Sequence, residues 1–439
     1  MLVAQVINLL YSIVDRIYIG RIPGEGTAAL GGIGLCFPII TLVTAFTNLY
    51  GSGGSPLCAI ARGQKDTARA EKIVNTAFRL LVITAVIITV IGLAFGEPLL
   101  YLFGASDTSI VYALPYLNIY ILGTIFAMIS TGMNAYINAQ GFSQTGMFTV
   151  LIGAAANIIL DPIFIFILGM GIRGAALATI ISQGLSAAFV VRFLAGRTSN
   201  AELKVHISRH DFAPDPEISK SIVELGLAAF IMQFTNSVVT IVCNKMLMIT
   251  GGELFVSVMT IIASVRQVLD TPILAISDGT TPVLSYNYGA RRPDRVRKSI
   301  AIMTAMCFIY TLVIVVLIQI IPHVFISVFT SDESLISEAV PAMHLYFFAF
   351  LFQSLQYSGQ TTFKALNKKK KAIFFSLFRK VVMVVPLTML LPVAFGLGSD
   401  GVFIAEPISN FIGGSASFTT MLLTVLPELK RIDAENEKA

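Results

Sequence analysis

The chain has 439 residues and a mean hydropathy of +0.81, and 55% of its residues are hydrophobic while only 13% are charged. Soluble domains carry about 25% charged residues, so this composition excludes an ordinary soluble protein and predicts one that is solvated by lipid. The formal net charge is +5, but the basic residues lie in a few loops and are not interleaved with aromatic residues, which argues against nucleic-acid binding.

The first predicted element is the apolar run from Leu2 to Ile19, in which the chain begins. This run lacks the basic start and the small-residue cleavage site of a signal peptide, so we interpret it as a spanning helix whose opening turns are short or missing. Backbone polar groups must be satisfied internally in lipid, which favours helices for this run and for those that follow.

Twelve apolar runs of about 20 residues, each long enough to cross a bilayer as a helix, follow one another along the chain. Their predicted bounds are 2–20, 33–60, 76–95, 113–138, 146–168, 173–195, 222–249, 254–286, 300–321, 340–364, 373–395 and 401–426. The sequence therefore predicts an all-α membrane protein with twelve transmembrane helices. Its four cysteines fall in apolar segments without CxxC spacing, so we expect packing residues rather than metal ligands or disulfides.

Basic residues alternate between the predicted loops. Lys and Arg cluster after the second, sixth, eighth and tenth helices, for example at Lys368 to Lys371, whereas the opposite loops hold more acids, such as Glu97 and Asp332. The positive-inside rule therefore predicts that the basic loops and both termini are cytoplasmic.

The chain is predicted to consist of two similar halves. Residues 1–195 form an N-terminal six-helix bundle, 196–220 a cytoplasmic linker, 221–426 a C-terminal six-helix bundle and 427–439 a frayed cytoplasmic tail. Segments recur about 226 residues apart, so that the run beginning at Gly174 is echoed by the run beginning at Gly401. Six is an even number of crossings, so both copies start on the same side, and this parallel repeat suits alternating access through a central cleft.

Acidic residues inside spans cost about 2.5–3.5 kcal/mol each on insertion scales, so Asp15 and Asp161 need an explanation. Asp15 lies in the first helix, four residues after Tyr11 and on the same face. Asp161 follows Asn157 by four residues in the fifth helix, and the adjacent Pro162 can kink that helix. Plainer interpretations stay open: Asp15 ends its helix near the interface or pairs with Arg16, and Asp161 satisfies the loosened backbone.

Thr179 in the sixth helix adds a hydroxyl group to this set, although such residues in membrane helices more often only pack. Carboxylate, amide and hydroxyl oxygens suit a hard cation, and the carboxylates can equally carry a proton. The second half lacks the two helix-five residues, because their counterparts are Met383 and Leu387. Its isolated acid, Glu406, is expected to be structural and to be neutralised by Arg379 or by the interface.

Further charges lie in the eighth helix, where Arg266, Asp270 and Asp278 fit a structural ion network as well as a transport role. Signals of an enzyme are poor, since the chain has neither a GxxxxGK[ST] phosphate loop nor an HExxH motif, and its four histidines are scattered. We expect neither an enzyme nor a bound cofactor.

Four segments, in this order along the chain, together resemble the MATE family, the multidrug and toxic compound extrusion transporters. They are LYSIVDRIYIG from Leu10 to Gly20, NIILDP from Asn157 to Pro162, YNYGA from Tyr286 to Ala290, and the stretch from Pro386 to Ser409. The resemblance covers nearly the whole chain, and the YNYG segment is similar to the MepA-like branch in particular.

This resemblance implies a V-shaped pair of bundles and the efflux of small lipophilic, mostly cationic compounds in exchange for protons or sodium ions. It implies a monomer that crosses a bacterial plasma membrane many times. It also implies a cation site, with sodium as one candidate ion, whose residues are Asp15, Asn157, Asp161 and Thr179, supported by Tyr11 and Tyr116. Another branch of the family places acids in the C-terminal bundle, where this chain has Gln233, Asn236, Gln353 and Gln356, so we expect no coupling site of that kind.

Three other functions share some of these features. A flippase of lipid-linked precursors shares this architecture, but it needs a strongly basic cavity, whereas nearly all bases are expected in cytoplasmic loops. A membrane-embedded enzyme needs clustered acids, histidines or a nucleophile at one depth, which only the pair Asp15 and Asp161 approaches. A pure channel fits two-fold repeats with buried acids less well than gated exchange does.

Overall fold

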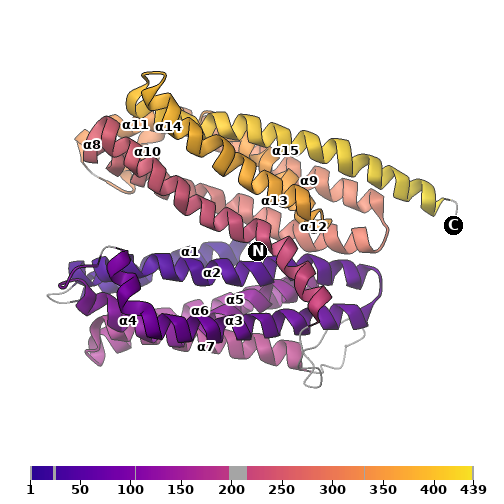
Figure 1. Cartoon of the computed structure of the whole chain (residues 1–439), viewed down its shortest axis with the longest axis horizontal. Coiled ribbons are helices and arrows are strands. Elements are labelled where there is room, and N and C mark those ends of the chain that lie inside the picture. Colours follow the sequence, from indigo (N-terminus) through magenta and orange to yellow (C-terminus); the bar gives the residue numbers. More distant parts are fainter. Residues whose placement is uncertain (1, 23–25, 104, 197–214, 331, 438–439) are drawn as a thin grey trace. The chain divides into compact units, whose positions relative to one another are not determined.

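The computed structural model describes the chain apart from residues 1, 23–25, 104, 197–214, 331 and 438–439 (Figure 1). The described residues are helical almost throughout, and no strand is assigned among them. The chain divides into two compact units, Met1–Gly226 and Leu227–Ala439, each of which is described by itself. Most of the predicted linker lies outside the described residues.

Unit 1 is a bundle of antiparallel helices that runs from indigo to magenta in Figure 1. Its elements are α1 (Leu2–Gly20), α2 (Gly26–Gly63), α3 (Thr67–Leu102), α4 (Ile110–Leu122), α5 (Thr124–Ala139), α6 (Ser143–Pro162), the π-helical turn η1 (Ile163–Ile167) and α7 (Gly171–Ala195). The helices α4 and α5 are one span bent by 55°. The first turns of α8 also belong to this unit, because Gly226 lies directly against the backbone of Leu49 on α2.

Unit 2 repeats the pattern with more interruptions. Its elements are the rest of α8 (Pro216–Gly289), α9 (Pro293–Ile320), α10 (Pro322–Ser327), α11 (Glu333–Phe347), α12 (Leu351–Ala365), α13 (Lys369–Leu377), the π-helical η3 (Phe378–Val384), α14 (Val385–Val393) and α15 (Gly398–Asn436). Gly252 breaks α8 into two spans, since its φ of 73° is a left-handed conformation that favours glycine. The helices α11 and α12 form a second bent span, with an angle of 48°.

These elements confirm the all-α, twelve-helix fold class. Among the described residues, eight helices are long and apolar enough to cross a membrane, and the two bent pairs raise the number to ten. The helices α1 and α15 complete six spans in each unit. The outer faces are apolar, as on α3, where Ile83, Val86 and Val90 are 46%, 51% and 62% exposed at helical spacing. Such a stripe suits contact with lipid.

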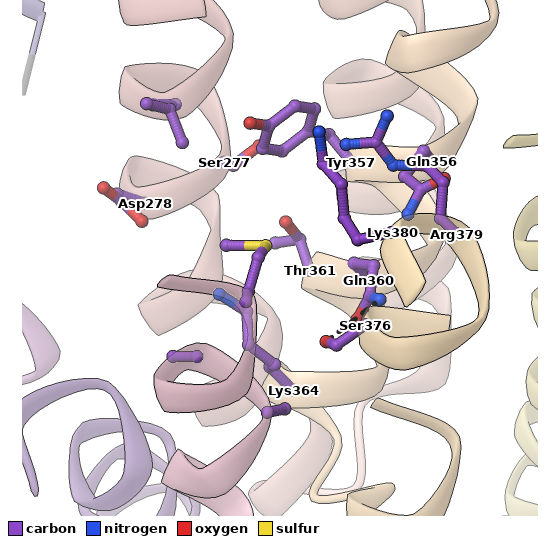
Figure 2. A pocket seen from close by; sticks show the side chains of 14 residues that line it. Ser277, Asp278, Gln356, Tyr357, Gln360, Thr361, Lys364, Ser376, Arg379 and Lys380 are labelled. Atoms are coloured by element: carbon purple, nitrogen blue, oxygen red, sulfur yellow. Dashed lines mark hydrogen bonds between the residues drawn. The ribbon is translucent and has the colours of Figure 1, made fainter. Parts of the chain in front are cut away.

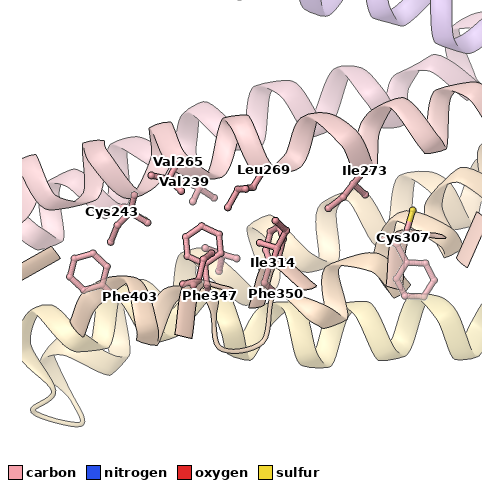
Figure 3. Packing of buried hydrophobic residues seen from close by; sticks show 14 of the residues in the cluster. Val239, Cys243, Val265, Leu269, Ile273, Cys307, Ile314, Phe347, Phe350 and Phe403 are labelled. Atoms are coloured by element: carbon pink, nitrogen blue, oxygen red, sulfur yellow. The ribbon is translucent and has the colours of Figure 1, made fainter. Parts of the chain in front are cut away.

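The apolar core of unit 2 joins α8, α9, α11, α12 and α15. Figure 3 shows Phe347 and Phe350 lying against α8 near Val265 and Leu269. These two rings flank the bend between α11 and α12, are fully buried, and meet edge to face with centroids 5.2 Å apart. Aromatic packing of this kind stabilises a bend that would otherwise leave a void.

The expectation of a frayed tail after residue 426 is wrong, because α15 continues as a helix to Asn436. The apolar seam of α15 extends past Pro427 through the fully buried Leu429. Beyond the seam, Glu428 meets Lys368 at 2.6 Å and Asp433 meets Arg297 at 2.6 Å. The acids of the tail thus have basic partners at the starts of α9 and α13, a pairing that charge counting along the sequence did not reveal.

Candidate functional site

Polar side chains of unit 1 gather where α1, α4, α6 and α7 pack together. Asn157 and Asp161 lie one turn apart on α6 and therefore share a face of that helix. The Asn157 amide nitrogen Nδ2 donates to Asp161 Oδ1 over 3.1 Å, and the two residues are only 1% and 0% exposed. The two predicted residues thus form a buried, hydrogen-bonded pair.

Asp15 on α1 completes a pair of acids with Asp161. Their carboxyl groups lie in hydrogen-bonding contact, because α1 packs along α6. Asp15 and Tyr11, one turn earlier on α1, are half-buried. Two carboxyl groups in contact cannot both stay charged without a counter-charge, since like charges disfavour ionisation of each other. A proton or a cation between the two carboxyl groups would remove this repulsion.

Two tyrosines of α4 form another wall of this site. Tyr116, a predicted supporting residue, lies close enough to Asp15 to interact with it electrostatically. Its ring stacks on Tyr120 with centroids 6.2 Å apart and an interplanar angle of 11°. The Tyr120 hydroxyl is hydrogen-bonded to Gln183 on α7. Sequence reasoning missed Tyr120, although the i, i+4 spacing of the two tyrosines was a signal that could have found it.

Thr179 lies on α7 at the level of the acidic pair. The register of α7 against α6 and η1 follows from two close approaches, Gly153 against Ser186 and Gly174 against Phe164. Between these contacts the antiparallel helices bring Thr179 opposite the last turn of α6, where Asp161 lies. Thr179 is 9% exposed. The structure thus brings all four predicted cation-site residues into one region of unit 1.

Two buried oxygens indicate what this region can bind. Asn157 Oδ1 and Asp161 Oδ2 accept no hydrogen bond from the described residues. Leaving a buried acceptor unsatisfied costs about 1–3 kcal/mol, so a ligand that satisfies it gains that energy back. A proton satisfies the carboxylate oxygen, and a hard cation satisfies both oxygens. The chemistry is therefore that of reversible cation or proton binding.

A second buried polar cluster surrounds Glu406 on α15, in unit 2. Glu406 Oε1 lies 2.6 Å from Arg266 on α8 and 2.8 Å from Arg379 on η3. Lys380, the next residue of η3, reaches the same oxygen at 3.3 Å. Glu406 is 4% exposed, so this is a buried ion network. The predicted neutralisation of Glu406 by Arg379 is confirmed.

Asp270 extends the network along α8. It accepts from Arg266 Nε at 3.3 Å and from Gln353 Nε2 at 2.7 Å. Gln353 on α12 is one of the uncharged residues that this chain has where another branch of the family has acids. The Gln353 side chain cannot titrate, but its hydrogen bond orients the carboxyl group of Asp270 on α8.

The expectation that nearly all bases lie in loops is wrong in unit 2. Arg379 and Lys380 are 8% and 7% exposed in the middle of a span, and the Arg266 side chain is 13% exposed. A buried base is expensive in a membrane and marks a functional site by default. Sequence reasoning missed Lys380, although two adjacent bases inside the predicted span 373–395 were a visible signal.

The family model MatE matches residues 1–163 and, a second time, residues 228–390. The chain belongs to the MatE family. One copy of the family model falls in each unit, in the same direction along the chain, as a parallel repeat requires. The MATE resemblance of the four sequence segments is thereby confirmed.

Curated relatives of this MatE protein include the multidrug export protein MepA of Staphylococcus haemolyticus strain JCSC1435. The two are 23% identical over 414 residues, which cover 94% of this chain and 90% of the relative. MepA of Staphylococcus aureus strain MRSA252 is 22% identical over 399 residues, covering 90% and 86% of the two chains.

Solved structures resemble the MatE protein over almost its whole length. A MATE transporter crystallised in a bent conformation aligns with a TM-score of 0.91 and 25% identity, covering 99% of this chain and 95% of the other. A MOP superfamily transporter from Pyrococcus furiosus, whose reversed pocket polarity is said to suggest a different function, aligns with a TM-score of 0.89 and 25% identity, covering 99% and 94%. The protein is thus a multi-pass membrane protein with a transporter fold.

Proposed function

We propose that this protein is a secondary active exporter of small lipophilic, mostly cationic compounds, which it exchanges for protons or sodium ions by alternating access. The observation that carries the proposal is the contact of Asp15 with Asp161, beside the unsatisfied oxygen of Asn157. Export of several drugs is what the names of the staphylococcal relatives state for those proteins. We also propose a monomer in a bacterial plasma membrane.

The proposed mechanism links ion binding to the shape of α6. A proton or cation that enters between the two carboxyl groups removes their mutual repulsion and lets α1 and α6 close on each other. The helix α6 ends at Pro162 and continues as the π-helical turn η1, so its backbone is already interrupted beside Asp161. An ion that crosses the membrane potential supplies about 2.3 kcal/mol per charge for each 100 mV, enough to bias a two-state equilibrium.

The test is ethidium efflux from inverted vesicles, with the proton and sodium gradients collapsed separately. We expect Asp161→Asn and Asp15→Asn to abolish gradient-driven efflux while the protein still folds. The amide side chain of asparagine neither takes up and releases a proton nor offers a negative charge to a cation. Asp107→Asn is the matched control, since Asp107 is exposed and accepts a hydrogen bond from Tyr101 alone among the side chains that the structure describes. If the Asp161→Asn protein exports ethidium at the wild-type rate, the coupling site is not at Asp161. If efflux requires neither the proton gradient nor the sodium gradient, the proposal of a secondary active exporter is wrong.

One observation favours a second candidate function, a flippase of lipid-linked precursors. The buried bases Arg266, Arg379 and Lys380 are the basic interior that such a protein needs for a pyrophosphate group. Vesicles that contain a fluorescent lipid-linked diphosphate separate the two functions. A flippase moves that lipid between leaflets, whereas an exporter does not.

A further inference from the structure

The ion network of unit 2 has one more positive group than negative. Within the part of the chain that the structure describes, Arg266, Arg379 and Lys380 meet two carboxylates, Glu406 and Asp270. An uncompensated charge in the interior of a membrane bundle is costly, because desolvation exceeds what a shared partner returns. The two arginines stay protonated in proteins, so the imbalance must be removed at Lys380 or by an anion from outside.

Lys380 is the least satisfied of the three bases. Arg379 has a second partner, Asn410 Oδ1 at 2.7 Å, and Arg266 has Asp270 and Gln353. Among the described residues, the only hydrogen bond of the Lys380 ammonium group goes to Glu406, at 3.3 Å. An ammonium group has three donors, so two of them remain for a ligand.

Lys380 and Arg379 also line a pocket of unit 2 between α8, α12 and the helices α13 and η3. Its empty space is about 630 Å3 when the open solvent at its mouth is included. Figure 2 shows both basic side chains near the Tyr357 ring, and Ser277 and Asp278 on the facing wall. Part of the lining is apolar, including Ala228, Met232 and Leu274. A wall that is part apolar and part polar fits an amphiphilic molecule.

Two further polar atoms of the pocket wall are unsatisfied. Ser277 Oγ and Gln356 Oε1 have no hydrogen-bond partner among the described residues, although these residues are only 4% and 8% exposed. The one acid of the wall, Asp278, interacts with Lys364, which lines the same pocket. That pair balances its own charge, so the excess that faces the pocket comes from Lys380 and Arg379.

We infer that this pocket binds the carboxylate or phosphate group of an amphiphilic anion, with Lys380 and Arg379 on the anionic group and the wall of α8 on the apolar body. The oxyanion completes the charge balance around Glu406, and the Ser277 hydroxyl is free to donate to it. The inference goes beyond the proposed exchange of cationic compounds and does not depend on it, since binding is measured without transport.

The purified full-length protein is titrated calorimetrically with naphthoate, naphthyl phosphate and uncharged naphthamide of the same ring substitution. We expect at least one anion to bind about tenfold more tightly than the amide, and the tighter anion identifies the head group. Equal binding of the amide and both anions would overturn the inference. This comparison uses the wild-type protein, so it does not depend on the folding of any variant.

Variants then locate the binding. Lys380→Met should weaken binding of the preferred anion by about tenfold or more, whereas Lys380→Arg, which keeps the charge, should retain it. Lys370→Met is the matched control, because Lys370 is exposed at the start of α13. If a folded Lys380→Met protein binds the anion with wild-type affinity, the inference is wrong. The three bases and two carboxylates of the network would then be balanced by a Lys380 that is uncharged.

Discussion

At the residue scale, Glu406 has a different environment from the acids of unit 1. One of its oxygens is shared by three bases from α8 and η3. Asp161, by contrast, is next to Asn157 and another carboxyl group. The first arrangement stabilises a permanent charge, whereas the second is the one that we propose exchanges an ion. This difference predicts opposite consequences of neutralising the two kinds of acid.

Glu406→Gln should destabilise the protein strongly, because it leaves the buried bases with Asp270 alone. Removing one partner of a buried ion pair costs about 3–5 kcal/mol. Lys380→Met should cost little, since it removes the excess charge, and it should partly rescue Glu406→Gln in the double variant. Thermal unfolding can be followed with a thiol-reactive dye, because all four cysteines are free and buried. Equal losses in the two single variants would contradict this account of the network.

Helical periodicity was sufficient to predict one pair of residues in the candidate site of unit 1, whereas the resemblance to the MATE family was needed to add Asp15 and Thr179. Asn157 and Asp161 share a face at i, i+4 spacing whatever the tertiary structure, so their pairing could be read from the sequence. The network of unit 2 could not be read in this way. It joins Arg266, Lys380 and Glu406 from three elements far apart in the chain, and only packing determines which base meets which acid.

At the element scale, the two halves repeat a close contact between helices. Gly174 on α7 lies so near η1 that an added Cβ would be 2.7 Å from the backbone of Phe164. Gly401, its predicted counterpart on α15, would place a Cβ 2.6 Å from the backbone of Pro392 on α14. The echo of the two runs in the sequence thus reflects one shared packing requirement, a sixth helix that approaches the end of the fifth.

Gly174→Ala and Gly401→Ala should each destabilise their own unit by about 1–3 kcal/mol, since an added methyl group must push backbone apart. Gly184→Ala, also on α7, is the matched control: the nearest atoms to its Cβ belong to Phe126 at 3.9 Å. There the alanine should stabilise the helix by about 0.5–1 kcal/mol. Unfolding temperatures of the three variants provide the measurement. A Gly174→Ala protein as stable as Gly184→Ala would refute the contact.

Hydropathy alone did not predict the breaks within spans. The predicted run 113–138 is α4 and α5 bent by 55°, and 340–364 is α11 and α12 bent by 48°. Hydropathy measures the length of an apolar run and is insensitive to its straightness. The π-helical turns η1 and η3 are likewise invisible to it, although both lie beside the buried charges of the two sites.

At the scale of the whole molecule, the described contacts bring the basic loops of unit 2 to one end of that unit. Lys368, which precedes α13, meets Glu428, and Arg297, at the start of α9, meets Asp433. Both acids lie in the last turns of α15, so the C-terminal end of the chain is on the same side of the membrane as these loops. The start of α11, with Asp332 as its N-cap and Glu333 as its first residue, follows one further crossing by α9.

This arrangement makes the predicted orientation testable with two cysteines. An excess of Lys and Arg keeps a loop in the cytoplasm, so the basic end of unit 2 should face inward. Lys370→Cys should resist an impermeant maleimide in intact cells and react after the cells are permeabilised. Glu333→Cys should react in intact cells, because an odd number of crossings separates it from Lys370. The native cysteines are all buried and give little background. If Lys370→Cys is labelled in intact cells and Glu333→Cys is protected, the predicted orientation is wrong and both termini lie outside the cell.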